Sequence, residues 1–359
     1  MIKTIEYSQI DENDKYVLID VRSPGEFKTA TIPGAVNVYL FDDEERKIIG
    51  TVYVQESVEK AKKLGMEAAS KNLPIIYEKI NQLGKEYKKL IFFCARGGMR
   101  SSSLVSLLAS LGVNALKLRG GYKGYRSYIN DELPKVIEKI NFTVIHGNTG
   151  TGKTDILKKL SQRGYDILDL EGAANHRGSL LGSVGLGSEN SQKQFESLVY
   201  HSLKNMKGNC IFVEGESKRI GNIIIPEFIY SAMRAGKHIN ITSNIDFRVK
   251  NIIKDYVQND ESEIKNNNLE IIEALNKLRK YISDKNIDNY IAEIESCNYE
   301  WVVEELMIKY YDPMYQNKEY NYDLHLKNNN IEETCNNIIG WMKNIDNRDK
   351  LCEAAFTKE

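Results

Sequence analysis

The stretch FTVIHGNTGTGKTDIL at 142–157 runs from an apolar segment through a glycine-rich turn into a helical pattern. Its turn fits G-x-x-x-x-G-K-[ST], and a strand before it and a helix after it are the setting that this phosphate-binding motif requires. Backbone N–H groups and the positive end of the helix dipole would point at an anion there. The alternative interpretation, a glycine-rich turn that binds no ligand, is disfavoured by this setting. The residues expected to bind a diphosphate are Gly147, Asn148, Thr149, Gly150, Thr151, Gly152, Lys153 and Thr154.

Carboxylates at two other predicted strand ends are candidates for a cation site beside this loop. They are Asp169 and Glu171 in DLEG, and Glu214 and Glu216 in FVEGES. Mg²⁺ is possible here, since the Thr154 hydroxyl would offer a further oxygen ligand and the Lys153 side chain would neutralise a terminal phosphate. The sequence FVEG is not the usual apolar run that ends in Asp, so these carboxylates equally suit caps of helices or turns. The sequence therefore assigns no definite metal ligand and predicts no tightly bound cofactor.

A second loop of the same type lies upstream, in IFFCARGGMRSSS at 91–103. A thiol reacts as its thiolate, and its pKa falls at a helix N-terminus beside cationic side chains. Cys94 meets both conditions, so we predict that it is catalytic. The alternative is a buried structural cysteine at the end of a core strand. The active-site loop expected to surround a sulfur, a selenium or a tetrahedral anion consists of Ala95, Arg96, Gly97, Gly98, Met99 and Arg100.

Apolar segments alternate with helical ones along most of the chain, which predicts two α/β domains with parallel sheets and sites at the carboxyl ends of the strands. Strands are expected at 16–21, 32–38, 89–93, 141–146, 165–170, 209–214 and 237–242. Helices are expected at 55–87 and around 153–162, 193–206 and 226–235. We expect a first domain at 1–130, a connecting helix or linker at 131–140, and a second domain at 141–359 whose part from about 246 to 359 is helical.

The composition excludes several classes of protein. Lys and Arg total 49 against 50 Asp and Glu, so the net charge of -1 gives no hint of a nucleic-acid partner, which would need a local basic face. No run of about 18 apolar residues is present and the first residues lack a secretion signal, so we expect a cytoplasmic protein without a membrane partner. The five cysteines contain no C-x-x-C pair and fit neither a disulfide framework nor a zinc site.

Four motifs of the first domain together resemble those of rhodaneses, which carry sulfur as a persulfide on a loop cysteine. They are DVRSPGEF at 20–27, TIPGAVNV at 31–38, CARGGMRS at 94–101 and LRGGYKGY at 118–125. Five residues separate Cys94 from Arg100, where many single-domain rhodaneses have four. C-x5-R is also the spacing of cysteine-dependent phosphatases, including those with the rhodanese fold. The loop alone therefore leaves sulfur-group transfer and phosphate-ester hydrolysis open.

The order of a rhodanese-like α/β domain followed by a P-loop NTPase-like α/β domain with a helical C-terminal part is similar to that of the bacterial tRNA 2-selenouridine synthases. The resemblance spans nearly the whole chain, apart from about 255–300. It includes DDEERKIIGTVY at 42–53, DLEGAANHRGS at 169–179, EGESKRIG at 214–221 and YYDPMY at 310–315.

This resemblance implies a transferase that acts on 2-thiouridine at the wobble position, in the anticodon region of certain tRNAs. It implies S-geranylation with geranyl diphosphate as co-substrate, followed by replacement of the geranylthio group by selenium from selenophosphate. The glycine-rich loop at 147–154 would bind the expelled diphosphate, and Cys94 would act in the selenium step. The sequence leaves the oligomeric state open.

Other segments are weaker candidates for substrate contacts. His176 and Arg177 in NHRGS, and Lys218 and Arg219 in ESKRIG, could contact a phosphate or the tRNA backbone, although a loop with a hydrogen-bonded histidine is an equal alternative. The tyrosines of YYDPMY could stack on a flipped base, but packing of a helix end against a turn is the favoured interpretation.

Three other functions compete with the modification of tRNA. A P-loop kinase with a regulatory rhodanese-like module is one, since ITSNIDFRVKNIIKDY at 241–256 resembles the strand and Arg-bearing helix of small-molecule kinases. The second is a rhodanese-fold C-x5-R phosphatase that ignores the phosphate loop. A non-enzymatic tRNA-binding or sulfur-relay scaffold is the third.

Overall fold

The computed structural model describes residues 2–11, 13–179, 181–257, 261–315 and 321–356, and the chain forms two compact units. The first unit consists of Met1–Lys135 and Asn190–His201, and the second of Val136–Glu189 and Ser202–Glu359. The chain passes from one unit to the other within helix α5 (Gly121–Ile137), which begins well before the predicted connecting segment at 131–140. Nothing in the sequence pattern indicated that 190–201 packs with the first unit.

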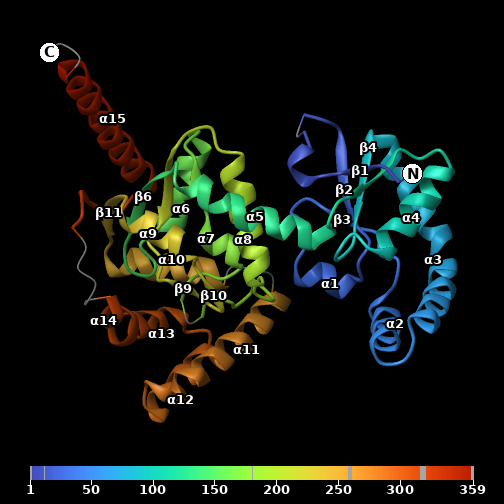
Figure 1. The fold of residues 1–359 in the computed structure, drawn as a ribbon. Coiled ribbons are helices and arrows are strands. Elements are labelled where there is room, and N and C mark those ends of the chain that lie inside the picture. The colour runs from blue at the N-terminus through green and yellow to red at the C-terminus, as the bar shows by residue number, and fades with distance from the viewer. Residues whose placement is uncertain (1, 12, 180, 258–260, 316–320, 357–359) are drawn as a thin grey trace. The chain divides into compact units, whose positions relative to one another are not determined.

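In the described part of the first unit, a parallel sheet has the strand order β1-β5-β4-β2-β3 (Figure 1). The strands are β1 (Thr4–Ile5), β2 (Tyr16–Asp20), β3 (Val36–Asn37), β4 (Lys89–Phe93) and β5 (Ala115–Leu118). Strands β2 and β4 are almost entirely buried, as expected for central parallel strands. The strand predicted at 32–38 is reduced to the two residues of β3, because a turn with Gly34 at a φ of 79° takes up its first half.

The helices of the first unit that precede its last strand are α1 (Pro24–Thr29), α2 (Asp43–Gln55), α3 (Val58–Glu86) and α4 (Met99–Ser110), and α5 follows that strand. The first three begin after side chains that accept hydrogen bonds from the free N–H groups of the first turn. Ser23, Asp42 and Ser57 cap α1, α2 and α3. The predicted helical stretch at 55–87 is therefore α3, and α2 is a further helix that lies outside the predicted range. Helices α2 and α3 pack against each other.

A buried ion pair joins the motifs of the first unit. The Arg22 guanidinium donates to both carboxylate oxygens of Asp20, at 3.0 Å from Nε to Oδ1 and 2.6 Å from Nη2 to Oδ2. The same Nη2 donates to the Ala30 carbonyl, and the Thr31 hydroxyl donates to Asp20 Oδ2. The guanidinium carbon also lies 4.3 Å from the centroid of the Tyr122 ring. These contacts connect the segments 20–27, 31–38 and 118–125 to one another.

In the described part of the second unit, a parallel sheet has the order β12-β11-β6-β8-β7. Its strands are β6 (Asn141–His146), β7 (Ile167–Leu168), β8 (Cys210–Glu214), β11 (Lys237–Thr242) and β12 (Leu324–Lys327). Strand β6 lies between β8 and β11, at a point where the order of strands along the chain reverses direction, and ligands of open α/β sheets bind at such points. The part from 246 onward is helical as predicted except for β12, which completes the edge of the sheet.

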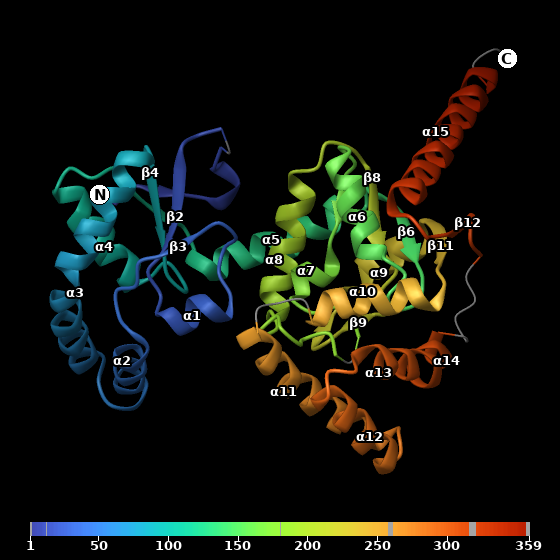
Figure 2. The same ribbon diagram turned by 180° about the vertical axis from the view of Figure 1, so that it is seen from behind.

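Helices surround this sheet and form an additional helical layer. The ranges are α6 (Lys153–Gln162), α7 (Leu170–Ala174), α9 (Glu227–Arg234), α10 (Ile245–Val257), α11 (Glu261–Lys277), α12 (Asp284–Glu295), α13 (Tyr299–Leu306), α14 (Asp312–Tyr315) and α15 (Ile331–Phe356). Helix α8 (Gln192–Lys204) belongs to the first unit as far as His201. A π-helical turn at Met307–Tyr311 joins α13 to α14. Helices α10 and α13 lie side by side (Figure 2), and their apolar residues share one core with α11 and α12. Helix α15 packs on α6. Within the described residues, no helix is both long and apolar enough to span a bilayer.

The buried ion pair generates a stability prediction. Asp20→Ala leaves the Arg22 charge buried without its partner, so we expect the first unit to lose about 3–5 kcal/mol of stability. Hydrogen exchange of peptides from β2 and β4, followed by mass spectrometry of the full chain, measures this loss. Trp301 and Trp341 both lie in the second unit, so their fluorescence should not change. Asp14→Ala, which removes the half-exposed pair with Lys89, is the control and should cost less than about 1 kcal/mol.

Candidate functional site

The Cys94 loop connects the end of β4 to the start of α4, and the turn before α5 holds its backbone. The N–H groups of Tyr122 and Lys123 donate to the carbonyls of Cys94 and Ala95, both at 2.9 Å. Gly121 has a φ of 59°, and a Cβ atom there would lie 2.2 Å from the Cys94 carbonyl oxygen. Only glycine permits this approach, so the glycines of LRGGYKGY determine the course of the Cys94 loop.

The Cys94 thiol is buried and has a lowered pKa. Burial raises the pKa, but hydrogen bonds from the Ser101 side chain and backbone, the Arg100 charge and the Arg96 backbone N–H outweigh it. The Ser101 hydroxyl oxygen lies 3.2 Å from Cys94 Sγ. Such an environment favours the nucleophilic thiolate. Ser101 was not among the residues predicted for the site, although its place in the first turn of α4 could have indicated it.

The two arginines of the loop differ in their surroundings. Arg100 donates from Nη1 to Glu26 Oε2 at 2.6 Å and from Nη2 to Glu26 Oε1 at 3.2 Å, so its charge is already paired. Arg96 and Met99 are exposed. Gly98 is the residue that precedes the first turn of α4. A tetrahedral anion in front of Cys94 would therefore contact the N-terminus of α4 and the Arg96 side chain. The Arg100 charge is less available to it, because Glu26 already pairs with that guanidinium.

The second loop runs from β6 to α6, which begins at Lys153. Lys153 Nζ donates to the carbonyl of Gly147 at 3.0 Å. Gly152 has a φ of 84°, and a Cβ atom there would lie 2.9 Å from Asn328 Nδ2. The glycine thus allows the loop to turn left-handed beside a neighbouring side chain, as the motif requires.

Side chains from distant segments bind the carbonyl groups of this loop. Arg248 Nε donates to Thr149 O at 2.9 Å, Asn251 Nδ2 to Gly150 O at 2.9 Å and Asn328 Nδ2 to Thr151 O at 2.8 Å. These residues were not predicted, because no local pattern reveals contacts between segments so far apart in the chain. These hydrogen bonds fix the course of the loop by satisfying three of its carbonyl groups.

Asp312 completes this arrangement. Its carboxylate accepts from both terminal nitrogens of Arg248, at 2.9 and 2.6 Å, and from Asn148 Nδ2 at 3.0 Å. The pair is partly buried, with the Arg248 side chain 7% exposed. In YYDPMY the residue that reaches the loop is therefore the aspartate. Of the tyrosines, Tyr311 belongs to the helical core and Tyr310 lies against it, as the favoured packing interpretation expects, and the Tyr315 side chain lies outside the described residues.

A polar cavity of about 320 Å³ opens beside the loop at 147–154. Its lining includes residues predicted for the diphosphate loop, for the cation site and for weaker substrate contacts. They are Thr149, Gly150, Gly152, Lys153, Thr154, Asp169, Glu171, His176, Arg177, Glu214 and Glu216. Gly147, Asn148 and Thr151 are part of the same loop, and Lys218 and Arg219 lie outside the lining of this cavity. The volume and the polar lining suit a diphosphate better than a large apolar group.

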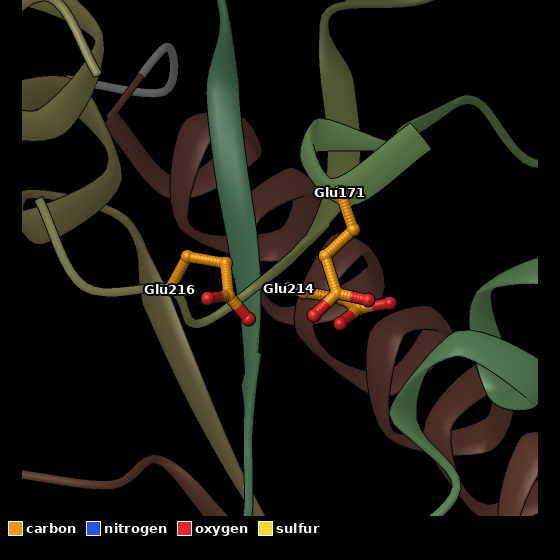
Figure 3. A group of neighbouring side chains, drawn as sticks. All are labelled: Glu171, Glu214 and Glu216. Atoms are coloured by element: carbon orange, nitrogen blue, oxygen red, sulfur yellow. The ribbon is translucent and has the colours of Figure 1, made fainter. Parts of the chain in front are cut away.

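Three carboxylates of this cavity point toward one another (Figure 3). Oxygen atoms of Glu171, Glu214 and Glu216 lie within 4.8 Å of one another. Burial, together with the charges of its neighbours, raises the pKa of Glu171 and of Glu214. Glu214 Oε1 is buried and makes no hydrogen bond. Carboxylate oxygens gathered in this way fit a hard cation such as Mg²⁺.

The other predicted polar residues have local roles in the structure. Asp169 caps α7 by accepting from the Gly172 N–H at 2.7 Å. His176 Nδ1 accepts from the Gly178 N–H at 3.2 Å, and burial lowers the pKa of this imidazole. Arg177 donates to the Val184 carbonyl and lies over the Tyr256 ring. Lys218 pairs with Glu227, and Arg219 Nε donates to the Gly221 carbonyl at 2.9 Å.

The first unit is a rhodanese-like domain that presents a cysteine, and the second is an α/β domain that presents a phosphate-binding loop. Residues 4–128 match the model of the rhodanese-like domain, and residues 140–347 match the model described as the tRNA 2-selenouridine synthase AAA domain. The chain therefore belongs to the tRNA 2-selenouridine synthase family, and the resemblance expected from the sequence is confirmed.

Relatives with the family's name support this membership. The chain is 31% identical over 338 residues to the tRNA 2-selenouridine synthase of Pseudomonas fluorescens strain Pf-5, covering 86% of this chain and 90% of that one. It is 34% identical to the tRNA 2-selenouridine synthase of Nitrosomonas europaea, covering 67% of this chain and 63% of the relative. The crystal structure of an N-terminal domain from a Clostridium difficile 630 protein is 38% identical, with a TM-score of 0.35, covering 35% of this chain and 98% of that one.

The environment of Cys94 predicts a pH dependence. The Ser101 hydroxyl stabilises the thiolate, so Ser101→Ala should raise the Cys94 pKa and move the midpoint of alkylation by iodoacetamide upward by about one pH unit. Below that midpoint the variant should react more slowly than the natural protein. Ser110→Ala, at the other end of α4, is the control and should leave the midpoint in place. An unchanged midpoint in Ser101→Ala would show that this hydrogen bond does not stabilise the thiolate.

Proposed function

We propose that this protein converts 2-thiouridine at the wobble position of tRNA to 2-selenouridine in two steps. The first is S-geranylation with geranyl diphosphate, and the second is replacement of the geranylthio group by selenium from selenophosphate. The observation that carries the proposal is that one chain of this family combines a lowered-pKa cysteine with a preformed phosphate-binding loop. Its macromolecular substrate is then the anticodon region of tRNA.

The chemistry of the first step matches the second unit. The thiocarbonyl sulfur attacks C1 of geranyl diphosphate, the C1–O bond breaks, the diphosphate leaves with the electron pair, and N3 of the base loses its proton. The charge that develops on the diphosphate would be stabilised by the N–H groups at 147–154 and by Lys153. Arg248 and Asp312 would keep that loop in place during the reaction.

A magnesium ion fits the same cavity. Glu171, Glu214 and Glu216 would hold it, and the buried Glu214 Oε1, which has no hydrogen-bond partner, would bind the cation. When bound, the ion would act as a Lewis acid that neutralises diphosphate charge. Without a cation, the carboxylates repel one another and an anionic ligand.

The chemistry of the second step matches the Cys94 loop. Selenium of selenophosphate bonds to C2 of the base, the C2–S bond breaks, and geranylthiolate leaves and takes up a proton. Water then cleaves the Se–P bond, which gives phosphate and the selenocarbonyl base with a proton on N3. The N-terminus of α4 and Arg96 would hold the tetrahedral anion, and the Cys94 thiolate would assist the displacement.

Substitutions should separate the two steps. We expect Cys94→Ser to permit geranylation and abolish selenation, and Lys153→Ala to slow geranylation by at least about tenfold, because one charge that stabilises the leaving group is lost. The protein is incubated with 2-thiouridine tRNA, geranyl diphosphate and selenophosphate, and digested nucleosides are analysed by mass spectrometry. Cys297→Ser, which replaces an exposed cysteine of the second unit, is the control and should leave both steps unchanged.

Other outcomes would contradict this division of labour. Loss of both steps in Cys94→Ser would place Cys94 in the geranylation step as well. If tRNA incubated with the natural protein contained neither geranylated nor selenium-containing uridine, the proposed function would be refuted. ATP turnover with a phosphorylated product that is insensitive to Cys94→Ser would favour the kinase, and Cys94-dependent hydrolysis of an aryl phosphate would favour the phosphatase.

The carboxylate cluster predicts a metal dependence. Glu214→Gln removes one negative charge from the cluster, so the Mg²⁺ concentration for half-maximal geranylation should rise by about tenfold. Titration of Mg²⁺ at saturating geranyl diphosphate measures this change. Glu227→Gln, an exposed carboxylate in α9, is the control. If Glu214→Gln leaves both diphosphate binding and its Mg²⁺ dependence unchanged, this carboxylate does not hold the ion.

A further inference from the structure

A large cavity borders the Cys94 loop in the first unit. Its volume is about 1550 Å³, and it lies between α2, α3, α4 and the loop itself. Six residues of the loop line it: Cys94, Ala95, Arg96, Gly98, Met99 and Arg100. The cavity thus belongs to the same site as the thiol and is not a separate hollow elsewhere on the unit.

The walls of this cavity are mainly apolar. Helix α2 contributes Ile49, Tyr53 and Val54, and α3 contributes Met66 and Leu73. Several of these side chains are unusually exposed for their type, with Val54 at 81% and Met66 at 76%. Apolar side chains that gather at an open cavity mark a binding site for an apolar ligand.

A selenium or sulfur atom on Cys94, or a tetrahedral anion in front of it, would fill a small fraction of this volume and would gain nothing from apolar walls. Arg96 and Arg100 belong to the loop of the thiol itself, Arg46 shares the partner Glu26 with Arg100, and Lys47 and Lys62 line the cavity from α2 and α3. A suitable ligand therefore has a long apolar part toward α2 and α3 and a polar, reactive end at Cys94. The cavity beside the phosphate loop has the opposite character, since it measures about 320 Å³ and is lined by charged residues.

We propose that the cavity between α2, α3 and the Cys94 loop binds the isoprenoid chain that is attached to the sulfur of the modified base. This inference rests on the proposed function and adds a binding site for the intermediate between the two steps. With the chain against Val54 and Met66, the sulfur and the C2 atom to which it is bonded lie at the Cys94 end of the cavity. When the C2–S bond breaks, geranylthiolate leaves with the electron pair, takes up a proton and remains in apolar surroundings.

The site also accounts for α2 and α3, which the chemistry of Cys94 does not itself require. Gly65 of α3 lines the cavity, and a Cβ atom there would meet only Phe41, at 3.5 Å, so the lack of a side chain leaves room on this wall. Recognition of the chain would make the selenium step selective for the alkylated base. Unmodified 2-thiouridine lacks the group that the cavity binds.

Matched substitutions test this site. Val54→Glu and Met66→Glu put a charge on the cavity wall, whereas Ile48→Glu and Ile75→Glu put one on the same two helices outside the lining. The exposed fractions of Ile48 and Ile75 are 53% and 57%. The substrates are anticodon stem-loop RNAs carrying S-geranyl-2-thiouridine or S-methyl-2-thiouridine, supplied with selenophosphate, so that neither geranyl diphosphate nor the phosphate loop is needed.

We expect both cavity variants to lower kcat/KM for the S-geranyl substrate by at least about tenfold, mainly through KM, because a carboxylate cannot be buried against an apolar chain. The S-methyl substrate, whose group is too short to reach these side chains, should be converted equally by all variants. The control variants should match the natural protein on both substrates.

A second readout does not depend on turnover. An S-alkyl RNA whose isoprenoid chain carries a photoreactive diazirine should label peptides of α2 and α3 in the full-length protein. Labelling confined to the second unit, or equal kcat/KM values of cavity and control variants on the S-geranyl RNA, would overturn the proposal. If the natural protein converts neither RNA and is not labelled at α2 or α3, the proposed function fails together with the site. Conversion of both RNAs at equal kcat/KM would refute the chain-binding site alone.

Discussion

The backbone carbonyl groups of two glycine-rich loops need hydrogen-bond partners, and the rest of each unit is arranged to supply them. A buried carbonyl without a partner costs free energy. Within the phosphate loop, Lys153 Nζ and the Thr151 N–H donate to the carbonyls of Gly147 and Asn148, and other segments supply the remaining donors. In the first unit, N–H groups at the start of α5 bind the carbonyls of Cys94 and Ala95. In the second, Arg248, Asn251 and Asn328 bind those of the phosphate loop. Hydrogen bonds from other segments therefore determine the course of both loops.

The two sites differ in the chemistry that their surroundings favour. Charged carboxylates, a lysine and a small polar cavity suit a hard, highly charged ligand and a hard cation. A buried thiol with a lowered pKa beside apolar walls suits a soft, polarisable atom on an uncharged carbon skeleton. One base whose substituent changes from sulfur to an alkylated sulfur to selenium would need both environments in turn. The first unit thus offers a mainly apolar cavity beside its thiol, and the second a polar cavity beside its glycine-rich loop.

The sequence was most informative where function depends on neighbouring residues. The strand, turn and helix at 141–162 and the loop after Phe93 follow from glycine content and apolar periodicity, which are local properties. Strand β12 was missed because its four residues, LHLK, alternate in exposure at the edge of the sheet and resemble the helical segments around them. The pairing of Asn148 with Asp312 joins residues 164 positions apart, and that of Arg248 with Asp312 spans 64. Such contacts leave no pattern in one sequence, except that Asp-Pro within an otherwise helical region is unusual.

The π-helical turn at Met307–Tyr311 gives Asp312 its direction. A π turn contains one residue more than an α turn, and each residue of an α-helix turns the chain by about 100°. The segment from α13 to α14 therefore carries an insertion that rotates everything after it toward Arg248 and Asn148. Loss of a single residue from 307–309 would rotate Asp312 by about 100° about the helix axis, away from the phosphate loop, although the sequence YYDPMY was intact. In this segment the number of residues matters as much as their identity.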